Sequence, residues 1–239
     1  MTSNITQENF SIIIPCYNEK ENIFDLIKEI DLYLKDYKNF EIIIVDDGSK
    51  DNLKEIYPKI LDINNLTRII SHKKNFGQSK AIYTGIREST YNVIVTIDAD
   101  GQNNPADIPK LLDIFFQNGD ISLVGGLRLK RKDNIVKRLS SILANKLRSA
   151  ILNDNCVDTG CSLKVFEKDI FLNFPFFDGI HRFLPALFIG FGKKTLYEEV
   201  NHRPRKLGMS KYGTFDRLVK GIRDLIKVRR IIKKMNIND

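Results

Sequence analysis

Two carboxylates one residue apart, Asp98 and Asp100, end an almost wholly apolar run and are followed by Gly101 and Gln102. Hard divalent cations such as Mg²⁺ and Mn²⁺ take oxygen ligands, and one or two carboxylates together with substrate phosphates commonly hold them. The pair can therefore clamp a metal ion on a diphosphate. Because an isolated acid-x-acid triplet is more often a polar turn, its meaning depends on what accompanies it.

Three further polar clusters each follow a short apolar run. They read PCYNE from residue 15, DDGS from residue 46 and NFGQSKA from residue 75. Any one of them alone can be a helix cap or a turn. If the apolar runs are parallel strands, all four clusters meet at the carboxyl edge of one sheet, where such sheets bind ligands. Together the clusters predict a nucleotide site.

Two common phosphate-binding sequences are missing from this predicted site. The chain has no Gly-x-Gly-x-x-Gly loop and no P-loop Gly-Lys-Ser/Thr, which speaks against a dinucleotide oxidoreductase and a P-loop NTPase. A metal ion on Asp98 and Asp100 would then have to neutralise the diphosphate.

The elements that must position the clusters alternate between strand and helix. Short β-branched runs predict strands over residues 10–15, 40–45, 66–71 and 91–97. Helical spacing predicts helices over 20–35 and 78–88. This alternation predicts an α/β fold with a mainly parallel sheet flanked by helices.

The second half of the chain is less regular. We expect a basic helix over 135–152, a strand over 160–166, an apolar helix over 181–191 and a last basic amphipathic helix over 215–232.

The composition is that of a folded protein with an anionic partner. Apolar residues make up 42% of the 239 residues and charged residues 28%, which argues against a disordered chain. The net charge is +8. The surplus is concentrated in 128–148, with eight basic residues and one acidic residue, and in 215–234, with eight basic and two acidic residues. Two such segments favour contact with an anionic surface or substrate.

The sequence also bears on location. Residues 1–9 lack the basic and apolar regions of a secretory signal, and no window approaches the roughly 20 apolar residues that span a bilayer. The odd number of cysteines, three, favours a reducing compartment. We expect a cytoplasmic protein that is soluble or peripheral.

In combination, the motifs resemble those of glycosyltransferase family 2. The matching stretches read IIIPCYNEKENI, IIIVDDGSKD, NFGQSKAIYTGI and VIVTIDADGQNNPADIP, and the match continues through VGGLRLKRKD, DTGCSLKVF and NHRPRKLGMSKYG. The resemblance covers about residues 10–215. Within the family it is strongest to the polyprenyl-phosphate glycosyltransferases, similar to dolichyl-phosphate mannose synthase. It implies a GT-A fold, a UDP- or GDP-sugar donor, Mg²⁺ or Mn²⁺, and an inverting mechanism.

The resemblance also implies roles for individual residues. Asp98, Asp100 and Gln102 match the metal ligands, and Asp46 and Asp47 match the acids that read the base. The implied nucleotide contacts are Pro15, Tyr17, Glu19, Asp46, Asp47, Gly77, Lys80 and Asp98. The implied catalytic residues are Asp98, Asp100, Arg128, Arg138, Arg205 and Lys211, with Ser210 in the same R-x-x-G-x-S-K element as the last two.

Two departures from the family pattern are visible. The usual Ser-Gly-Phe-Arg appears as Cys161-Ser162-Leu163-Lys164, so the role of the arginine falls to Lys164 with a different hydrogen-bond geometry. Residues 176–183 differ from the mannose synthase pattern and resemble a bacterial branch. That difference weakens any inference of mannose. Within this stretch, His181 and Arg182 are candidates to face an acceptor phosphate.

The acceptor that the resemblance implies is a polyprenyl phosphate, such as undecaprenyl phosphate. A phosphate monoester is largely dianionic at neutral pH, since its second pKa lies near 6, so it needs no general base. Arg128, Arg138, Arg205 and Lys211 would offset its repulsion from the donor. The alternative acceptor is a saccharide hydroxyl, which requires a base, and Asp158 and Asp178 are the candidates.

Two other function classes compete with the transferase. A nucleic-acid-binding protein would explain the positive charge, but the sequence shows no recognised nucleic-acid module, so no nucleic-acid partner is expected. A catalytically idle nucleotide-binding scaffold is disfavoured by the intact Asp98 and Asp100. A homo-oligomer is compatible with the sequence.

We expect a glycosyltransferase domain over residues 1–214 and a basic amphipathic helix over 215–239. Phe215, Leu218, Val219, Ile222, Leu225 and Ile226 form an apolar stripe on that helix. Such a helix can lie on an anionic membrane surface or pack on the body of the protein. The first case places the protein on the cytoplasmic face of the membrane.

Overall fold

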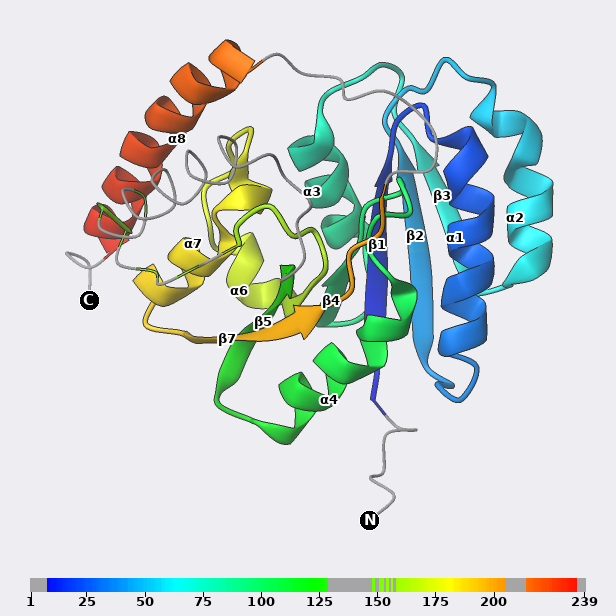
Figure 1. The fold of residues 1–239 in the computed structure, drawn as a ribbon, viewed down its shortest axis with the longest axis horizontal. Helices are drawn as coiled ribbons and strands as arrows, with labels where there is room; N and C mark the ends of the chain where they lie inside the picture. The colour runs from blue at the N-terminus through cyan, green and yellow to red at the C-terminus, as the bar shows by residue number, and fades with distance from the viewer. Residues whose placement is uncertain are drawn as a thin grey trace.

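Seven strands form one sheet in the order β3-β2-β1-β4-β6-β5-β7 (Figure 1). The computed structural model describes residues 8–128, 148, 151–152, 154, 156, 158–204 and 214–235, with the side chains of the last segment given at 221 and 223–234. The strands are β1 (Phe10–Cys16), β2 (Phe40–Asp46), β3 (Thr67–Ser71), β4 (Val93–Thr96), β5 (Ile121–Arg128), β6 (Lys164–Glu167) and β7 (Lys194–Val200). Only β6 runs antiparallel to its neighbours, so its first residue lies at the carboxyl edge of the other strands.

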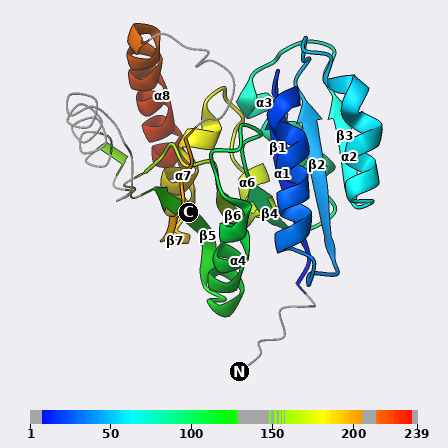
Figure 2. The same ribbon diagram turned by 45° about the vertical axis from the view of Figure 1, so that its right-hand side comes forward.

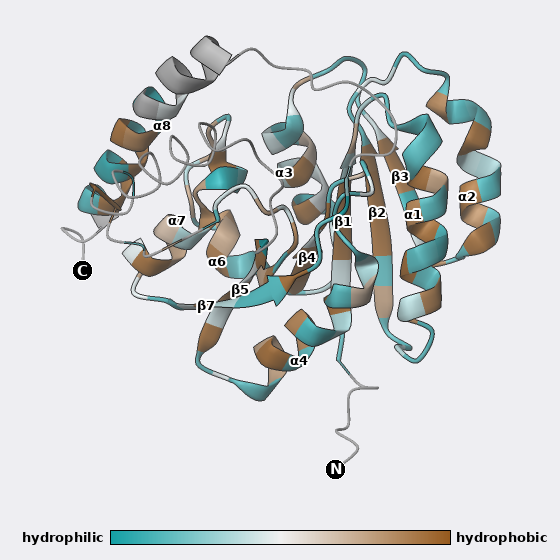
Figure 3. Cartoon of the chain, viewed as in Figure 1, coloured by the Kyte–Doolittle hydropathy of each residue, from teal (hydrophilic) through white to brown (hydrophobic). Residues whose placement is uncertain are grey.

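The central strands are buried on both faces. β1 reads FSIIIPC and β2 reads FEIIIVD, and every residue of β2 is buried. Such continuous β-branched runs are typical of parallel strands that helices cover on both sides. Figure 3 shows the same strands as mainly hydrophobic stretches between helices of mixed polarity.

Helices cover the sheet in two groups. One apolar cluster joins it to α1 (Lys20–Tyr33), α2 (Tyr57–Ile63) and α4 (Ile108–Gln117). The other joins it to α3 (Gln78–Glu88), α6 (Lys168–Leu172), α7 (Leu184–Gly190) and α8 (Thr214–Met235). Short 3₁₀ turns are η2 (Leu53–Ile56), η3 (Pro105–Asp107) and η4 (Ile180–Arg182). Both ribbon views place α2 and α8 at opposite ends of the molecule (Figures 1 and 2).

The predicted α/β fold with a mainly parallel sheet is confirmed, and the predicted helix over 78–88 matches α3 at both ends. The strand expected over 160–166 was placed too early, because residues 159–160 form a turn and strand pairing begins only at Lys164.

The apolar helix expected over 181–191 is a 3₁₀ turn followed by the shorter α7, whose second residue is Pro185. Proline is tolerated in the first turn of a helix, where its missing N–H has no partner to lose. Most of the basic helix expected over 135–152 lies outside the described residues.

The last helix, α8, packs on the body along one side. Leu225 and Val228 are buried in the second apolar cluster. Asp224 pairs with Arg182 at 2.8 Å, and the Lys227 ammonium lies 5.2 Å from the centre of the Phe177 ring. Its exposed residues include Ile226 and the cations Arg223, Lys227, Arg229, Arg230, Lys233 and Lys234. Of the predicted apolar stripe, Leu225 therefore packs on the protein and Ile226 faces solvent, while the side chains of the other four lie outside the described residues.

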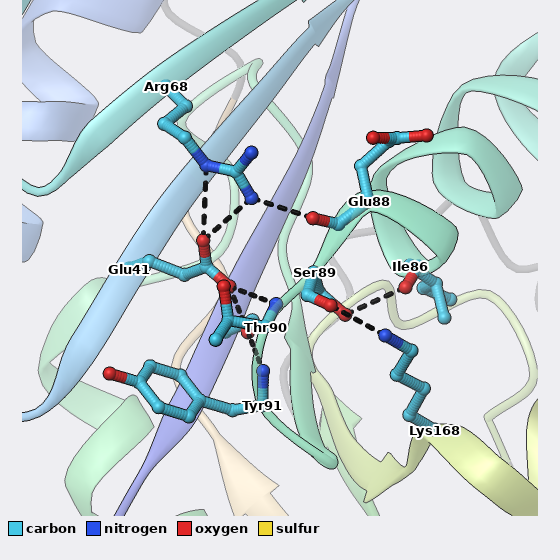
Figure 4. A network of polar contacts seen from close by, with 9 residues as sticks. Glu41, Arg68, Ile86, Glu88, Ser89, Thr90, Tyr91 and Lys168 are labelled. Carbon is cyan, nitrogen blue, oxygen red and sulfur yellow. Dashed lines mark hydrogen bonds and ion pairs between the residues drawn. The ribbon is translucent and has the colours of Figure 1, made fainter.

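A polar network closes the amino edge of the sheet (Figure 4). The Glu41 carboxylate accepts hydrogen bonds from the Ser11 hydroxyl at 2.7 Å, the Thr90 amide at 2.5 Å and the Arg68 guanidinium at 2.8 Å. Burial alone would raise the pKa of Glu41, but these donors hold it below its ordinary value. The protein itself satisfies this carboxylate, so the network has a structural role.

Among the residues that the structure describes, no helix is both long enough and apolar enough to cross a membrane.

Candidate active site

The loops after β1 and β2 are joined at the carboxyl edge of the sheet. The Asn18 amide donates to the Ser49 hydroxyl at 3.0 Å, and the Lys50 amide donates to the Asn18 side chain at 2.7 Å. Asp51 accepts from the Lys20 amide at 2.9 Å and so caps α1 from the neighbouring loop. These bonds hold the first two predicted polar clusters side by side.

Asp47 organises the loop that leads into α3. Its carboxylate accepts from the amides of Phe76 and Gly77 at 2.9 and 2.8 Å, and it lies 2.7 Å from the His72 Nδ1 atom. Gly77 has a φ of +93°, which a residue with a side chain rarely adopts. The second and third clusters therefore meet through one buried carboxylate, and His72 has the hydrogen-bonded structural role of a positioning residue.

The other predicted nucleotide contacts surround this loop. Asp46 is buried and accepts from the Tyr57 hydroxyl at 2.5 Å and from the Ser49 amide at 2.8 Å. Glu19 is buried and accepts from the Asn22 side chain at 2.7 Å. Pro15 and Tyr17 are partly exposed at and just beyond the end of β1. The Lys80 ammonium lies 5.2 and 5.5 Å from the ring centres of Tyr83 and Phe176, so the structure places it on the aromatic side of α3.

Asp98 and Asp100 follow β4 at the centre of this edge. The Gln78 side chain donates to Asp98 Oδ1 at 2.7 Å, and the Asp98 amide donates to the Ser162 hydroxyl at 3.2 Å. The Gln102 amide donates to Asp100 Oδ1 at 3.1 Å. The two carboxylates open on different sides, since Asp98 lines a cavity beside α3 and Asp100 lines a small cleft beside α1.

The electrostatics of this pair suit a cation. Burial and then the nearby charge of Asp100 raise the pKa of Asp98 to about 6, because both disfavour the charged form of the carboxyl group. The described residues hold no group of three or more His, Cys, Asp or Glu side chains suited to a metal. Two carboxylates without a third match the way Mg²⁺ is commonly held, with water and substrate phosphates completing its shell.

Arg128, at the end of β5, is paired with Asp158. Its Nε and Nη2 atoms donate to the two carboxylate oxygens at 2.7 Å each, and both side chains are about nine-tenths buried. A guanidinium has five N–H donors, so this bidentate pair leaves others available to a phosphate. The predicted residues Arg138, Arg205, Ser210 and Lys211 lie outside the described residues.

Sequence reasoning gave no individual role to several residues that position the site. Gln78 and Ser162 hold Asp98, and Asn103 accepts from the Ser162 hydroxyl at 2.7 Å. Arg203 joins the chain after β7 to the loop after β4, donating through its amide to the Gln102 carbonyl at 2.8 Å. Gln78 and Ser162 lie within the quoted motifs, but their contacts depend on which strands become neighbours.

Comparisons with known proteins agree with this geometry. The model of glycosyl transferase family 2 matches residues 11–173. The chain is 32% identical to the undecaprenyl-phosphate 4-deoxy-4-formamido-L-arabinose transferase of Pectobacterium carotovorum, over 92% of this chain and 67% of that protein. It is 33% identical to the dodecaprenyl-phosphate galacturonate synthase of Rhizobium johnstonii, over 91% of this chain and 65% of that protein. The chain thus spans about two thirds of the length of these relatives.

The fold resembles that of a solved enzyme. Glucosyl-3-phosphoglycerate synthase from Mycobacterium tuberculosis, crystallised with Mn²⁺, UDP and phosphoglyceric acid, superposes with a TM-score of 0.69 at 19% identity, covering 93% of this chain and 77% of that one. With four polar clusters at one sheet edge and a family match over most of its length, the chain belongs to glycosyl transferase family 2 and is a glycosyltransferase of GT-A fold.

Proposed function

We propose that this chain transfers a sugar, with inversion, from a UDP- or GDP-sugar to a polyprenyl phosphate such as undecaprenyl phosphate, for modification of cell-envelope glycans. Mg²⁺ or Mn²⁺ would be held by Asp98, Asp100 and Gln102. Relatives that are 32 and 33% identical are named for transfer to undecaprenyl and dodecaprenyl phosphate. Their names support the class of acceptor but leave the sugar open, since the two names carry different sugars.

The Arg128–Asp158 pair is the observation that carries the choice of acceptor. A hydroxyl acceptor needs a carboxylate that is able to take a proton, and Asp158 was one of two candidates. Its oxygens each accept a 2.7 Å bond from Arg128, so both are already engaged by a buried guanidinium. A phosphate acceptor needs no proton removed, and it gains from a buried arginine at the same place.

The chemistry then follows from position and charge. A bound divalent ion would stabilise the negative charge on the leaving diphosphate. Asp47 and the loop it fixes would contact the nucleoside at the β1–β2 side. Arg128 lies beyond β6 on the other side, so the donor and the acceptor approach the sugar from opposite directions, as an in-line displacement requires.

The test is a panel of UDP- and GDP-sugars with Mn²⁺ or Mg²⁺ and undecaprenyl phosphate, followed by mass spectrometry of the lipid. We expect one glycosyl phospholipid product that is absent when Asp100→Asn replaces the wild type. Transfer to a lipid-linked saccharide with none to the lipid phosphate would contradict the proposal. In that case Asp178→Asn, which changes the other candidate base, should abolish turnover and leave donor binding intact.

We also propose that the protein works at the cytoplasmic face of the membrane, through the exposed side of α8. The exposed residues of α8 include Ile226 and six cations, Arg223, Lys227, Arg229, Arg230, Lys233 and Lys234. Each basic residue near an anionic bilayer contributes about 1 kcal/mol. Co-sedimentation with vesicles that contain anionic lipid should be lost when Arg229 and Arg230 are both changed to Gln. Equal binding to neutral vesicles would contradict an electrostatic association.

A further inference from the structure

A small cavity lies next to Asp98, on the side of the sheet that α3 and α7 cover. It measures about 80 Å³, which is room for a small polar group. The residues that give it chemical character are Gln78, Asp98, Ser162, Lys164, His181 and Arg182.

Lys164 is the least expected of these residues, because it is a lysine with only 4% of its surface exposed. It opens β6, whose reversed direction brings it opposite Thr96 at the carboxyl edge. Its ammonium donates to the Cys161 carbonyl, and no ion pair between described residues includes it. Burying a charge is costly unless it is closely paired, and the charge of Asp98 opposes that of Lys164 only from a distance. A lysine kept there therefore suits an anionic partner that arrives with the substrate.

His181 and Arg182 are fixed by contacts with two other helices. The Ser79 hydroxyl of α3 accepts from the Gly179 amide at 2.7 Å and lies 2.8 Å from His181 Nδ1. Arg182 donates through Nη2 to Asp224 of α8 at 2.8 Å. The 3₁₀ turn that carries both residues is thus held against α3 and α8, and the cavity is preorganised on that side.

Charge balance indicates when the partner enters. The nearby charge of Asp98 partly offsets that of Lys164. A divalent ion shared by Asp98 and Asp100 would cancel both carboxylates and leave the charge of Lys164 uncompensated. The cavity would then suit an anion.

The reaction offers three sources of that anion: the donor diphosphate, the acceptor phosphate and an acidic group on the sugar. The diphosphate is expected at the metal, between the two aspartates and towards the nucleoside side. The cavity lies on the other side. Lys164 belongs to β6, which lies between β4, the strand that precedes Asp98, and β5, the strand that ends at Arg128. We propose that Lys164, His181 and Arg182 form the binding site for the phosphate monoester of the acceptor. This inference rests on the proposed function and names the residues that would hold its acceptor.

In the step that follows, an oxygen of the acceptor phosphate forms a bond to the anomeric carbon. The bond from that carbon to the diphosphate oxygen breaks, and the diphosphate leaves with the electron pair. No proton needs to move. The task of the three side chains is to hold two polyanions in one cleft, so Lys164 and Arg182 contribute by attraction and orientation.

The test measures binding of farnesyl phosphate to the full chain by calorimetry, in the presence of Mn²⁺ and UDP. A charge-assisted hydrogen bond contributes about 1.5–3 kcal/mol, so Lys164→Met should weaken farnesyl phosphate at least about tenfold while UDP affinity with Mn²⁺ stays within about twofold. Farnesol, which has the tail without the phosphate, should bind the variant and the wild type equally. In turnover, the KM for the acceptor should rise and the KM for the donor should not.

A matched control and a second variant guard against a folding defect. Lys168 is a half-buried lysine four residues further along, and it donates to the Ser89 carbonyl at 2.5 Å at the opposite edge of the sheet. Lys168→Met should leave farnesyl phosphate affinity unchanged. Arg182→Gln changes a partly exposed side chain and should weaken farnesyl phosphate in the same direction as Lys164→Met.

Three results would overturn the proposal. The first is farnesyl phosphate affinity that neither variant alters. The second is an equal loss of UDP affinity in Lys164→Met, which would place Lys164 on the donor. The third is a selective loss of UDP-uronic acids relative to UDP-glucose, which would assign the cavity to the sugar. Failure of the proposed function looks different, because the wild type itself would then neither bind farnesyl phosphate nor glycosylate it.

Discussion

At the amino edge of the sheet, the Glu41 carboxylate accepts bonds from Ser11, Thr90 and Arg68, and its pKa lies below the ordinary value (Figure 4). At the carboxyl edge, Asp98 stands beside Asp100, and its pKa is raised to about 6. The two carboxylates lie at opposite edges of one mainly parallel sheet. The protein itself supplies the hydrogen-bond donors that stabilise the charge of Glu41. The charge of Asp98 instead suits a divalent cation and a substrate as its partners.

The largest effect that tests this comparison is on activity. Asp98→Asn keeps the shape of the side chain and removes one charge from the proposed metal pair. We expect turnover to fall at least about 10³-fold, or about 4 kcal/mol of transition-state stabilisation. Steady-state kinetics with saturating Mn²⁺ measure it. Loss of less than tenfold would show that Asp98 is not needed for the metal.

The next effect is on stability at the other edge. Glu41→Gln removes the charge that Arg68 and two other donors share, and we expect it to lower the free energy of unfolding by about 2 kcal/mol, with Tm falling by about 6 °C. This figure is discounted because the Arg68 side chain is 48% exposed. Glu88→Gln is the control, since Glu88 takes part only through its backbone carbonyl. A stable Glu41→Gln protein with reduced kcat would contradict a purely structural role.

A smaller effect has the opposite sign. In the metal-free protein, Asp98→Asn removes a carboxylate whose ionisation is unfavourable in the fold, so this inactive variant should be more stable than the wild type at neutral pH by about 1 kcal/mol. Thermal unfolding in chelator measures the difference, and added Mn²⁺ with UDP should stabilise the wild type only. A lower Tm for the variant in chelator would show that Asp98 is structurally satisfied.

The smallest effects are in the pH dependence of these stability differences. The native pKa of Glu41 is lowered, so its stabilisation is fully present above its ordinary value of 4.5 and disappears as the pH falls through its native pKa. The native pKa of Asp98 is raised, so ionising Asp98 lowers the free energy of unfolding by its full amount above about pH 6. This loss of stability decreases as the pH falls from about 6 to the ordinary pKa of 3.8. At pH 5 the advantage of Asp98→Asn should already have shrunk, while the deficit of Glu41→Gln should be intact. If both stability differences decreased together between pH 7 and pH 5, the opposite directions of the two pKa shifts would be contradicted.

Much of the first half of the fold was predictable because its signals are local. The buried strands β1 and β2 are continuous β-branched runs, and α3 begins after Gly77 and ends at Glu88. Four strand-end clusters pointed to one edge, and the structure brings them there. The elements α2 and α4 were not predicted, although α4 has buried residues Ile108, Leu111, Leu112 and Phe115 at helical spacing.

The rest depended on tertiary contacts. β5 contains the pair Gly125-Gly126, which weakens a strand signal, and β7 is an edge strand with few buried residues. The reversed direction of β6 cannot be read from four residues, yet it decides that Lys164 stands beside Asp98. For the same reason, sequence alone named Asp158 as a candidate base and Arg128 as a phosphate ligand without showing that they are partners.

The central claim is that the carboxyl edge is completed by a divalent ion and a nucleoside diphosphate. Calorimetric titration of UDP and GDP into the wild type, with Mn²⁺ or with chelator, tests it most directly, with Asp100→Asn as the comparison. We predict that Mn²⁺ strengthens binding of one nucleotide at least about tenfold in the wild type and has no such effect in Asp100→Asn. Equal affinity with Mn²⁺ and with chelator in the wild type would contradict the account.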